Sequence, residues 1–545
     1  MKPFTKILAC SIFAILLSGS ALFASSYAVL SPSLEKISSD PNSSDSLVKV
    51  LVYISNEMAG TQANKIAATS NLMAAERHRQ VLNLLKSGSE SMLTKLKSDI
   101  RALIPNAEIK EFWIAPALSL KISVSQIEQI RNLPGVTAVI EDAPVEYIKP
   151  VETMPTAAKV MGPSTHLTAL NVPTLWSRGL KGRGRLVCSF DTGVEWSHPA
   201  LQSKWRGNRV PHQAALFAPE TTDTLPVDKV GHGTHTMGIM LGSTTADSFG
   251  VAPDAEWISA AVIDQGQTLT RTISDILAAF QWAVDPDGDP NTENDVPDVI
   301  LNSWGVPTSI LPACDQTFYG AIDNVEAAGI VTVFAAGNEG PNPMTMRIPA
   351  TRATTPLNSF AVGAIDDAIS TIADFSSRGP SGCDTNQIKP EVVAPGVSIY
   401  SSYRGGTYKI MSGTSMAAPF IAGLVALLRQ YNPETTVEQI KTAIIQSSRD
   451  LGPAGEDNTY GFGLPDAARA IQYLPAPAKP EVFIATQVIG GDGIADPGEF
   501  FDLFLRLNLP AGNIDSLTGT ISTTDTGISV ISNRALFAFE SGITY

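Results

Sequence analysis

Short, almost continuous apolar runs alternate with longer amphipathic stretches through the middle of the chain. The runs are typical of strands buried on both faces, and they cover residues 184–191, 256–264, 298–304, 329–337 and 358–366. In 271–284 and 315–329 the apolar residues recur every three or four positions, the spacing of one helical face. This alternation predicts an α/β fold, a parallel twisted sheet with helices on both faces. The working residues of such a sheet gather at the carboxyl ends of its strands.

A small α+β unit is predicted ahead of this region, over residues 47–149. The polar stretch 31–46 is expected to be a spacer before it, and 150–165 a linker after it. The unit itself alternates strand patterns (47–55, 115–123, 135–142) with helix patterns (93–104, 124–133).

Residues 480–545 are predicted to form a separate β-rich region. A proline-containing hinge, "APAPAK", comes before it, and the α/β region is expected to occupy 150–475. The short strand patterns and turns resemble part of a β-sandwich, which usually needs about 100 residues. We therefore expect this region to be incomplete.

The first 28 residues have the layout of a secretory signal peptide. Lys2 and Lys6 precede an apolar stretch, Ile7–Leu17, and small residues follow, so cleavage is expected after Ala24 or Ala28. The apolar stretch is shorter than the roughly 20 residues that span a membrane. The pattern predicts a secreted protein that is soluble once processed, extracellular or, in a Gram-negative bacterium, periplasmic.

Charge and cysteine content narrow the picture further. The 545 residues carry a net charge of −15 without a long basic run, which argues against a nucleic-acid partner. Without Cys10 of the leader, three cysteines remain. Cys314 and Cys383 lie in loop-like sequence and are predicted to pair, whereas Cys188 lies in an apolar run and is expected to be a buried thiol.

Three short motifs carry candidate chemistry. Asp191 ends an apolar run in "FDTG", His232 stands between glycines in "GHGTH", and Ser415 opens a long apolar helix in "GTSMAAP". A serine hydroxyl becomes a nucleophile when an imidazole takes its proton and a carboxylate orients that imidazole. Thr407, Ser412 and Thr414 are the neighbouring hydroxyls, but Ser415 is the one placed at the positive end of the helix. Asn338, at the end of "VFAAGN", offers an amide to an oxyanion.

These motifs resemble those of the subtilisin-like serine proteases, and within that family the secreted bacillopeptidase F-like branch. The resemblance covers about 190–471 and rests on "FDTGVEWSHPAL", "GHGTHTMGIM", "ILNSWG", "VTVFAAGNEGP", "FSSRGPS", "KPEVVAPGV" and "MSGTSMAAPFIAG". It implies a subtilisin-like peptidase domain and a monomeric serine endopeptidase that hydrolyses peptide bonds through an acyl-enzyme, with no cofactor for the chemistry. Asp191 would orient His232, the general base; Ser415 would be the nucleophile and Asn338 the oxyanion donor.

The same resemblance assigns roles to neighbouring segments. Ser303-Trp304-Gly305 and Ala335-Ala336-Gly337 would flank a substrate backbone added as an extra strand. Residues 47–149 resemble the inhibitory propeptide of an autoprocessed zymogen, with "VEYIKP" in the active site until cleavage between about Pro150 and His166.

Two departures from the family pattern stand out. Phe420 replaces the usual histidine behind the nucleophile, which we interpret as a packing change. The short segment "GSTTADSFGVAP" leaves no room for the calcium loop that many relatives insert there.

An acidic stretch, "DPDGDPNTEND", offers hard oxygen ligands in Asp285, Asp287, Asp289, Glu293 and Asp295. Pro290 and Val296 stand where an EF-hand needs glycine and glutamate, so it is not an EF-hand. The two readings left are a structural calcium site and a solvated turn.

Arg347 falls where the family places a residue at the base of the main specificity pocket. A guanidinium there would favour Glu or Asp before the scissile bond, and the alternative is a surface arginine in a shifted loop. Of the other histidines, His235 is expected in the core and His198 in a turn.

Other functions compete with the endopeptidase. An exopeptidase or a narrow processing protease would use the same site, and an adhesion protein would work through 480–545 with a silent core. An esterase is disfavoured because "GTSMA" lacks the last glycine of a G-x-S-x-G elbow.

Overall fold

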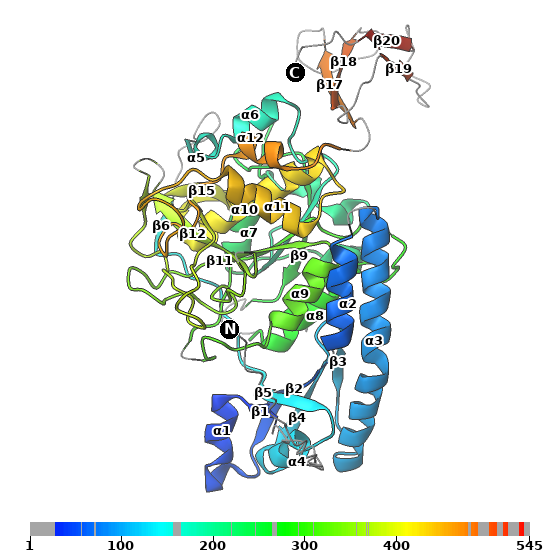
Figure 1. The fold of residues 1–545 in the computed structure, drawn as a ribbon, viewed down its shortest axis with the longest axis vertical. Coiled ribbons are helices and arrows are strands. Elements are labelled where there is room, and N and C mark those ends of the chain that lie inside the picture. The colour runs from blue at the N-terminus through cyan, green and yellow to red at the C-terminus, as the bar shows by residue number, and fades with distance from the viewer. Residues whose placement is uncertain are drawn as a thin grey trace, which may run out of the picture.

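The computed structural model describes most of residues 28–477 and four later strands (Figure 1). The ranges outside the description are 1–27, 56, 70–71, 156–164, 220, 246, 264–269, 293, 309, 356, 367, 369, 478–480, 489–500, 509–515, 521–533 and 539–545. The predicted signal peptide therefore lies outside the described residues but for Ala28. Within the described part, no helix is both long and apolar enough to cross a membrane.

An eight-stranded sheet forms the centre of what we call the main body, residues 165–474. Seven strands are parallel and the edge strand β13 is antiparallel. Phe190, Asn302 and Phe334 share one row of the register, so Asp191, Ser303 and Ala335 emerge together at the carboxyl edge. In spatial order the strands are β13 (Thr371–Ile372), β12 (Phe360–Asp366), β11 (Val331–Ala335), β10 (Val299–Asn302), β7 (Leu186–Asp191), β9 (Glu256–Ala261) and β8 (Leu216–Phe217), with β14 (Val392–Pro395) paired to β12.

Helices cover both faces of this sheet (Figure 1). On one face α7 (His232–Leu241) packs against α10 (Thr414–Tyr431), with α11 (Val437–Ser447) beyond it. On the other face lie α8 (Ile273–Ala283) and α9 (Tyr319–Ala327). Their apolar sides and the fully buried strands make one continuous core. The predicted α/β class, with helices on both faces of a parallel sheet, is confirmed.

A second, mixed sheet forms the N-terminal unit, residues 28–149. It has its own apolar core. The stretch expected to be a spacer, 31–46, contains helix α1 (Pro32–Ser38) and follows β1, which pairs with β5. The helix predicted over 93–104 is the end of a 30-residue helix, α3 (Ala74–Leu103). The strand order is β1 (Val29–Leu30), β5 (Val136–Glu141), β2 (Leu47–Ile54), β4 (Ala117–Ser123) and β3 (Lys110–Phe112), and α2 (Glu57–Ala67) and α4 (Ile127–Arg131) complete the unit.

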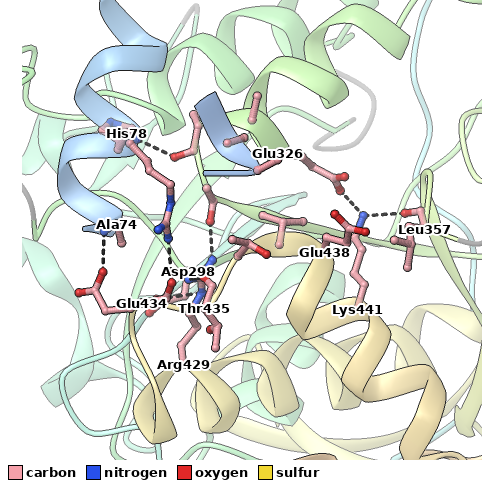
Figure 2. A pocket seen from close by; sticks show the side chains of 18 of the residues that line it. Ala74, His78, Asp298, Glu326, Leu357, Arg429, Glu434, Thr435, Glu438 and Lys441 are labelled. Carbon is pink, nitrogen blue, oxygen red and sulfur yellow. Dashed lines mark hydrogen bonds and ion pairs between the residues drawn. The ribbon is translucent and has the colours of Figure 1, made fainter. Parts of the chain in front are cut away.

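The N-terminal unit lies against α9 through α2 and α3 and against α8 through β3 (Figure 1). A cavity of about 1030 Å³ remains where this contact reaches the start of α11, as Figure 2 shows. Around it the two parts are joined by polar bonds: His78 Nδ1 lies 2.8 Å from Ala328 O, and the backbone N–H of Ala74 donates to Glu434 Oε2 at 2.6 Å. Beside the cavity the junction is packed and apolar, because Leu82, Leu85 and Phe112 of the N-terminal unit belong to the same buried cluster as Ile322 and Val325 of α9.

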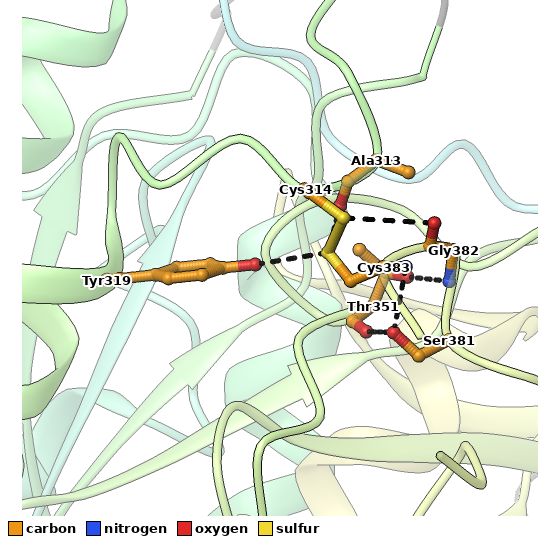
Figure 3. The surroundings of a disulfide bond; sticks show 7 residues. All are labelled: Ala313, Cys314, Tyr319, Thr351, Ser381, Gly382 and Cys383. Atoms are coloured by element: carbon orange, nitrogen blue, oxygen red, sulfur yellow. Dashed lines mark hydrogen bonds between the residues drawn. A yellow bond between two sulfur atoms is a disulfide. The ribbon is translucent and has the colours of Figure 1, made fainter. Parts of the chain in front are cut away.

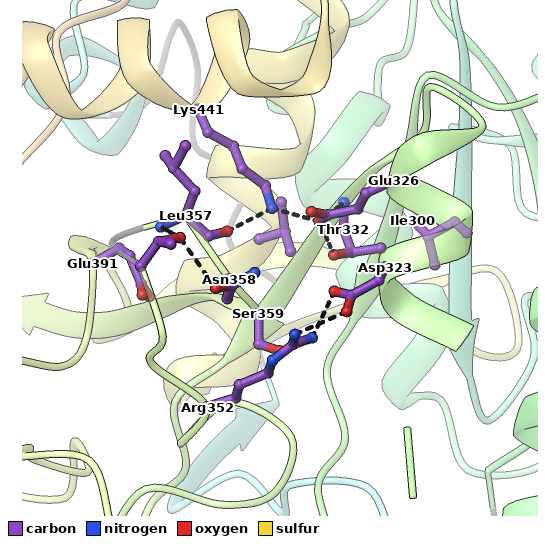
Figure 4. A network of polar contacts seen from close by, with 12 residues as sticks. Ile300, Asp323, Glu326, Thr332, Arg352, Leu357, Asn358, Ser359, Glu391 and Lys441 are labelled. Carbon is purple, nitrogen blue, oxygen red and sulfur yellow. Dashed lines mark hydrogen bonds and ion pairs between the residues drawn. The ribbon is translucent and has the colours of Figure 1, made fainter. Parts of the chain in front are cut away.

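Buried ion pairs fasten α9 and α11 to the sheet (Figure 4). The ammonium of Lys441, on α11, bonds to Glu326 of α9 and to the carbonyl of Leu357. The same carboxylate accepts from Thr332 on β11. Because Lys441 is almost fully buried, its charge needs these partners.

A disulfide joins Cys314 to Cys383, as predicted (Figure 3). It links the loop before α9 to the loop that follows "FSSRGPS", and Ser381 beside it donates to the carbonyl of Thr351 at 2.6 Å. Cys188 is a buried free thiol, also as predicted, and burial raises its pKa well above the usual value.

Beyond the main body the described strands form two antiparallel pairs. β17 (Glu481–Val488) pairs with β18 (Phe501–Asn508), and β19 (Ser516–Thr520) pairs with β20 (Arg534–Ala538). The prediction of a partial sandwich otherwise lies outside the described residues.

Removing the disulfide should lower stability without unfolding the protein. The bond closes a loop with a sequence separation of 69 residues, so Cys314→Ser should lower the free energy of unfolding by about 2–4 kcal/mol. Denaturant unfolding in a Ser415→Ala background, which avoids self-digestion, measures this. Reductant should destabilise the parent and leave Cys314→Ser unchanged; equal sensitivity of the two would contradict the assignment.

Candidate active site

The carboxylate and the imidazole predicted to work together are in direct contact. Asp191 ends β7, His232 begins α7, and Asp191 Oδ1 lies 2.7 Å from His232 Nδ1. Both side chains are 1% exposed. A carboxylate only accepts, so Nδ1 carries the proton and Nε2 is left as the basic nitrogen. Gly233 permits this approach, because a Cβ there would stand 2.1 Å from Gly193 O and 3.0 Å from Asp191 Cβ.

The position of α7 depends on a residue that the sequence analysis did not single out. Asp228 is buried and accepts from the backbone N–H groups of Val230, Gly231 and Thr234, at 2.7–3.0 Å. Its carboxylate also accepts from the hydroxyls of Thr192 and Thr234. Burial raises the pKa of Asp228, and the hydrogen bonds from Thr234 and Gly231 oppose that rise. Asp228 therefore ties the turn after β7 to the start of the helix that carries His232.

Ser415 lies in the first turn of α10 and is completely buried. The amide of Asn338 fixes this turn: its Oδ1 accepts from the backbone N–H and the hydroxyl of Thr414, both at 2.9 Å. With Oδ1 held in this way, Nδ2 is presented as a donor. Gly413 leaves room for it, since a Cβ there would stand 3.0 Å from Asn338 Nδ2.

Residues 144–151, which we call the crossing segment, run from the N-terminal unit directly over these side chains. Ser415 Oγ donates to the carbonyl of Ile148 at 3.1 Å, and Asn338 Nδ2 donates to the carbonyl of Lys149 at 2.9 Å. The ring of Tyr147 lies 4.8 Å from that of His232. His232 Nε2 is buried and has no hydrogen-bond partner among the described residues. Ser415 and His232 thus face the same short stretch of backbone, although no bond joins them directly.

The crossing segment is held as a strand between two edges. On one side the N–H of Ile148 donates to Ser303 O at 3.2 Å, and Tyr147 bridges Trp304 in antiparallel fashion. On the other side the N–H of Val145 donates to Arg271 O at 2.9 Å. The sequence analysis missed this second edge, Arg271 with Thr272, which carries no distinctive motif.

Ala335, Ala336 and Gly337 lead from β11 to Asn338, beside the first turn of α10. They show no hydrogen bond to the crossing segment in the described part of the chain. Gly337 N–H donates instead to the Thr414 hydroxyl at 3.1 Å, and Ala336 O accepts from Arg347 N at 3.1 Å. The triplet lies behind Asn338 and supports the turn of α10.

The chain that passes over Ser415 is paired in two registers, and the register upstream of Ser415 differs by one residue from the register downstream. Upstream, pairing with Ser303 puts the carbonyl of Ile148 beside the hydroxyl. Downstream, Val151 N–H donates to Ser412 O at 2.9 Å, β6 (Glu152–Pro155) pairs with β16 (Thr407–Ser412), and the carbonyl that reaches Asn338 is that of Lys149. Nucleophilic attack needs the hydroxyl and the oxyanion donors on one carbonyl, whereas here they fall on successive ones.

Arg347 lies between the two glycines of the flanking segments. Its Nη1 donates to Gly305 O at 3.2 Å, and a Cβ at Gly337 would stand 3.3 Å from its Cγ. Its Nε donates to Glu339 Oε1 at 2.8 Å. The Arg347 side chain is 15% exposed, so it is an ion-paired group beside Gly305 rather than one reaching into solvent.

The acidic stretch brings together three of its five predicted ligands. One carboxylate oxygen each of Asp285, Asp287 and Asp295 lie within 4.8 Å of one another. Asp289 is exposed and turns to Asn291, whose backbone and side-chain N–H groups lower its pKa. Glu293 lies outside the described residues.

His235 lies in the core and His198 in a turn, as the sequence predicts, and Phe420 is a packing residue. His235 is buried with Nε2 at 3.0 Å from Lys409 O, and desolvation lowers its pKa to about 3, so it is neutral. His198 sits in a turn, with Nε2 at 2.9 Å from Thr407 O. Phe420 is buried and packs near the His166 ring.

A carboxylate, an imidazole and a hydroxyl at one end of a parallel α/β sheet, with an amide beside the hydroxyl, define a serine hydrolase type of site. Comparison with known proteins gives the family. The model of the subtilase family matches residues 182–463, and the chain belongs to this family of serine proteases.

Individual relatives agree with this assignment. Bacillopeptidase F of Bacillus subtilis (strain 168) is 31% identical over 477 residues, which cover 81% of this chain but 32% of the relative. An alkaline protease of Alkalihalobacillus alcalophilus is 31% identical over 364 residues, 66% of this chain and 81% of the relative. The chain therefore spans about a third of bacillopeptidase F and most of the shorter relative.

A solved structure supports the fold. Fervidolysin from Fervidobacterium pennivorans, described as a keratinolytic enzyme related to subtilisin, superposes with a TM-score of 0.56 at 21% identity. The match covers 85% of this chain and 65% of fervidolysin. The predictions of a subtilisin-like fold and of a subtilisin-like serine protease family are confirmed.

Replacing Asp228 should loosen the start of α7. Asp228→Asn replaces one carboxylate oxygen by an NH₂ group, which cannot accept a hydrogen bond. A buried N–H of Gly231 or Thr234 then loses its acceptor, so the free energy of unfolding should fall by about 2–4 kcal/mol. Denaturant unfolding in the Ser415→Ala background measures the loss. Asp254→Asn, at a more exposed carboxylate, is the matched control; an equal effect of both changes would refute the capping role.

Proposed function

We propose that this chain is a serine endopeptidase made as an inactive precursor. Ser415 attacks the peptide carbonyl, His232 takes the hydroxyl proton through Nε2, and Asp191 orients the imidazole and stabilises its charge. Asn338 donates through Nδ2 to the oxyanion of the tetrahedral intermediate. An acyl-enzyme forms on Ser415 and water releases it, so the chemistry needs no cofactor.

The observation that carries the proposal is the course of the crossing segment. Backbone carbonyls of Ile148 and Lys149 receive the hydroxyl of Ser415 and the amide of Asn338, beside the Asp191–His232 pair. A peptide bound as an added strand is the way a protease with little sequence restriction would hold a substrate. The substrates we propose are therefore proteins and peptides.

The N-terminal unit serves, in this proposal, as an intramolecular inhibitor. It is tethered to the crossing segment and rests on α8 and α9, and its Asp142 accepts from the backbone N–H and the hydroxyl of Ser274 in the first turn of α8, at 2.8 and 2.7 Å. The one-residue mismatch at Ser415 keeps the bound strand from being poised for attack. Cleavage near Lys149, or in the linker that runs to His166, would then begin maturation.

We also propose that the chain is exported and acts as a monomer. The proposal of export rests on the leader-like residues 1–28 and on the disulfide, which persists in oxidising compartments.

Labelling by a fluorophosphonate probe tests the nucleophile. The processed wild-type chain should be labelled, and Ser415→Ala should lose the label and on the order of 10⁶-fold of kcat. Ser415→Ala should also stay full length, whereas the N-terminus of the processed wild-type protein, read by mass spectrometry, should fall between Lys149 and His166. Labelling that survives in Ser415→Ala, or an unlabelled wild type, would favour a silent core in a binding protein.

We further propose that Arg347 gives a preference for Glu or Asp before the scissile bond. The guanidinium lies beside Gly305, on the edge that pairs with the crossing segment, and Glu339 holds it. A substrate carboxylate would compete with Glu339 for the same charge, and an apolar residue would leave the pair closed.

Two substitutions with opposite effects test this preference. The measured quantity is kcat/KM for a peptide with Glu before the scissile bond divided by kcat/KM for the same peptide with Ala there. Arg347→Gly should lower this ratio about 10-fold. Glu339→Gln should raise it several-fold, because it removes the competing carboxylate. A peptide library read by mass spectrometry gives both ratios, with Arg183→Ala as a surface control. Absence of acidic enrichment in the wild type, unchanged by Glu339→Gln, would rule the preference out.

A further inference from the structure

The loop between α8 and β10 has the geometry of a calcium site. Ca²⁺ takes oxygen ligands at about 2.3–2.6 Å, so two of its ligands stand at most about 5 Å apart. The carboxylate oxygens of Asp285, Asp287 and Asp295 lie within 4.8 Å of one another.

Two of these carboxylates each have one buried oxygen that accepts no hydrogen bond in the described part of the chain, while the other oxygen of Asp295 accepts from the backbone N–H of Asp287 at 3.3 Å. Asp285 Oδ1 and Asp295 Oδ1 have no hydrogen-bond partner among the described residues, and Asp295 is 5% exposed. Unpaired buried oxygens of like charge are unfavourable unless a cation joins them.

The loop fastens the two edges that hold the crossing segment. Asp285 comes two residues after α8, and the other end of α8 begins directly after Thr272. Asp295 comes shortly before β10, and Ser303 follows that strand. A cation bound by this loop would thus join the end of α8 to the start of β10. Arg271 and Thr272 lie at the opposite end of α8, and Ser303–Gly305 follow the opposite end of β10.

A cationic group of the N-terminal unit already reaches this loop. The ammonium of Lys86, on α3, forms an ion pair with Asp285 Oδ2 and lies 5.4 Å from the centre of the Trp113 ring. The Asp285 side chain is 6% exposed and that of Lys86 is 36% exposed. Docking of the N-terminal unit therefore neutralises one of the three carboxylates that would bind the ion.

We propose that Asp285, Asp287 and Asp295 form a Ca²⁺ site and that Lys86 lowers its affinity. Ca²⁺ and the docked N-terminal unit then oppose each other, and by linkage each weakens the binding of the other by the same factor. The site itself does not depend on the proposed peptidase activity; a role in maturation does.

Calorimetric titration with CaCl₂ tests the site on the full-length Ser415→Ala chain, in which no self-cleavage can change the N-terminal unit. One Ca²⁺ should bind per chain. Asp287→Asn, at an exposed position, should weaken binding at least 10-fold, and Lys86→Gln should strengthen it about 5-fold, a modest factor because Lys86 is partly solvated. Lys95→Gln, at an exposed lysine of the same helix paired with Asp99, is the matched control and should change nothing.

Each outcome decides one part of the proposal. The site is overturned if no saturable binding appears up to about 10 mM CaCl₂. It is also overturned if Asp287→Asn and Asp295→Asn both leave binding unaffected while they keep the circular dichroism of the parent. Equal affinities of Lys86→Gln and Lys95→Gln overturn the competition. Peptidase activity failing in the wild type would leave both measurements valid, so the two proposals can fail separately.

Discussion

The pair of hydrogen bonds between Asn338 and Thr414 is the constraint on which the site depends. It joins the end of β11 to the first turn of α10, and so sets the buried helix against the sheet at the point where Ser415 emerges. The same bonds decide which atom of the Asn338 amide points outward. One interaction therefore fixes the position of the hydroxyl and the polarity of its neighbour, and Gly413 is required because a side chain there would crowd that amide.

The N-terminal unit uses the main body in a way that a substrate would. It contributes a strand between Arg271 and Ser303 through backbone bonds, and outside that strand it is held by polar contacts around a cavity and by a buried apolar cluster shared with α9. The strength of the docking thus comes from main-chain pairing, from tethering and from a packed apolar interface that includes Leu82, Leu85 and Phe112. Such an arrangement restrains the site while the chain is intact, and separation of the two bodies after a cut would have to expose this apolar surface to water.

Much of this could be predicted from the sequence because buried strands and small-residue turns leave local patterns. The strands ending at Asp191 and Asn302, the helix behind Ser415 and the pairing of Cys314 with Cys383 all follow from runs of a few residues. What could not be predicted depends on contacts between distant segments. The role of Asp228 depends on five hydrogen-bond donors that only the folded chain brings around its carboxylate. Arg271 and Thr272 form an edge through backbone groups, which leave no sequence signal. The ion pair of Arg347 with Glu339 depends on the conformation of the loop between them. The stretch expected to be a spacer over 31–46 instead begins with helix α1, which buries Leu34 in the core of the N-terminal unit next to the pairing of β1 with β5.

The pairing of β6 with β16 has a kinetic consequence. A cut near Lys149 produces two ends that belong to different bodies. The upstream end leaves with the N-terminal unit, in a dissociation that dilution favours and that excess free unit would reverse. The downstream end stays covalently attached to the main body and is held by pairing with Lys409–Ser412, so its departure is unimolecular and independent of protein concentration. Bond cleavage and full exposure of Ser415 are then separate events, and the appearance of activity would have one phase that responds to concentration and one that does not.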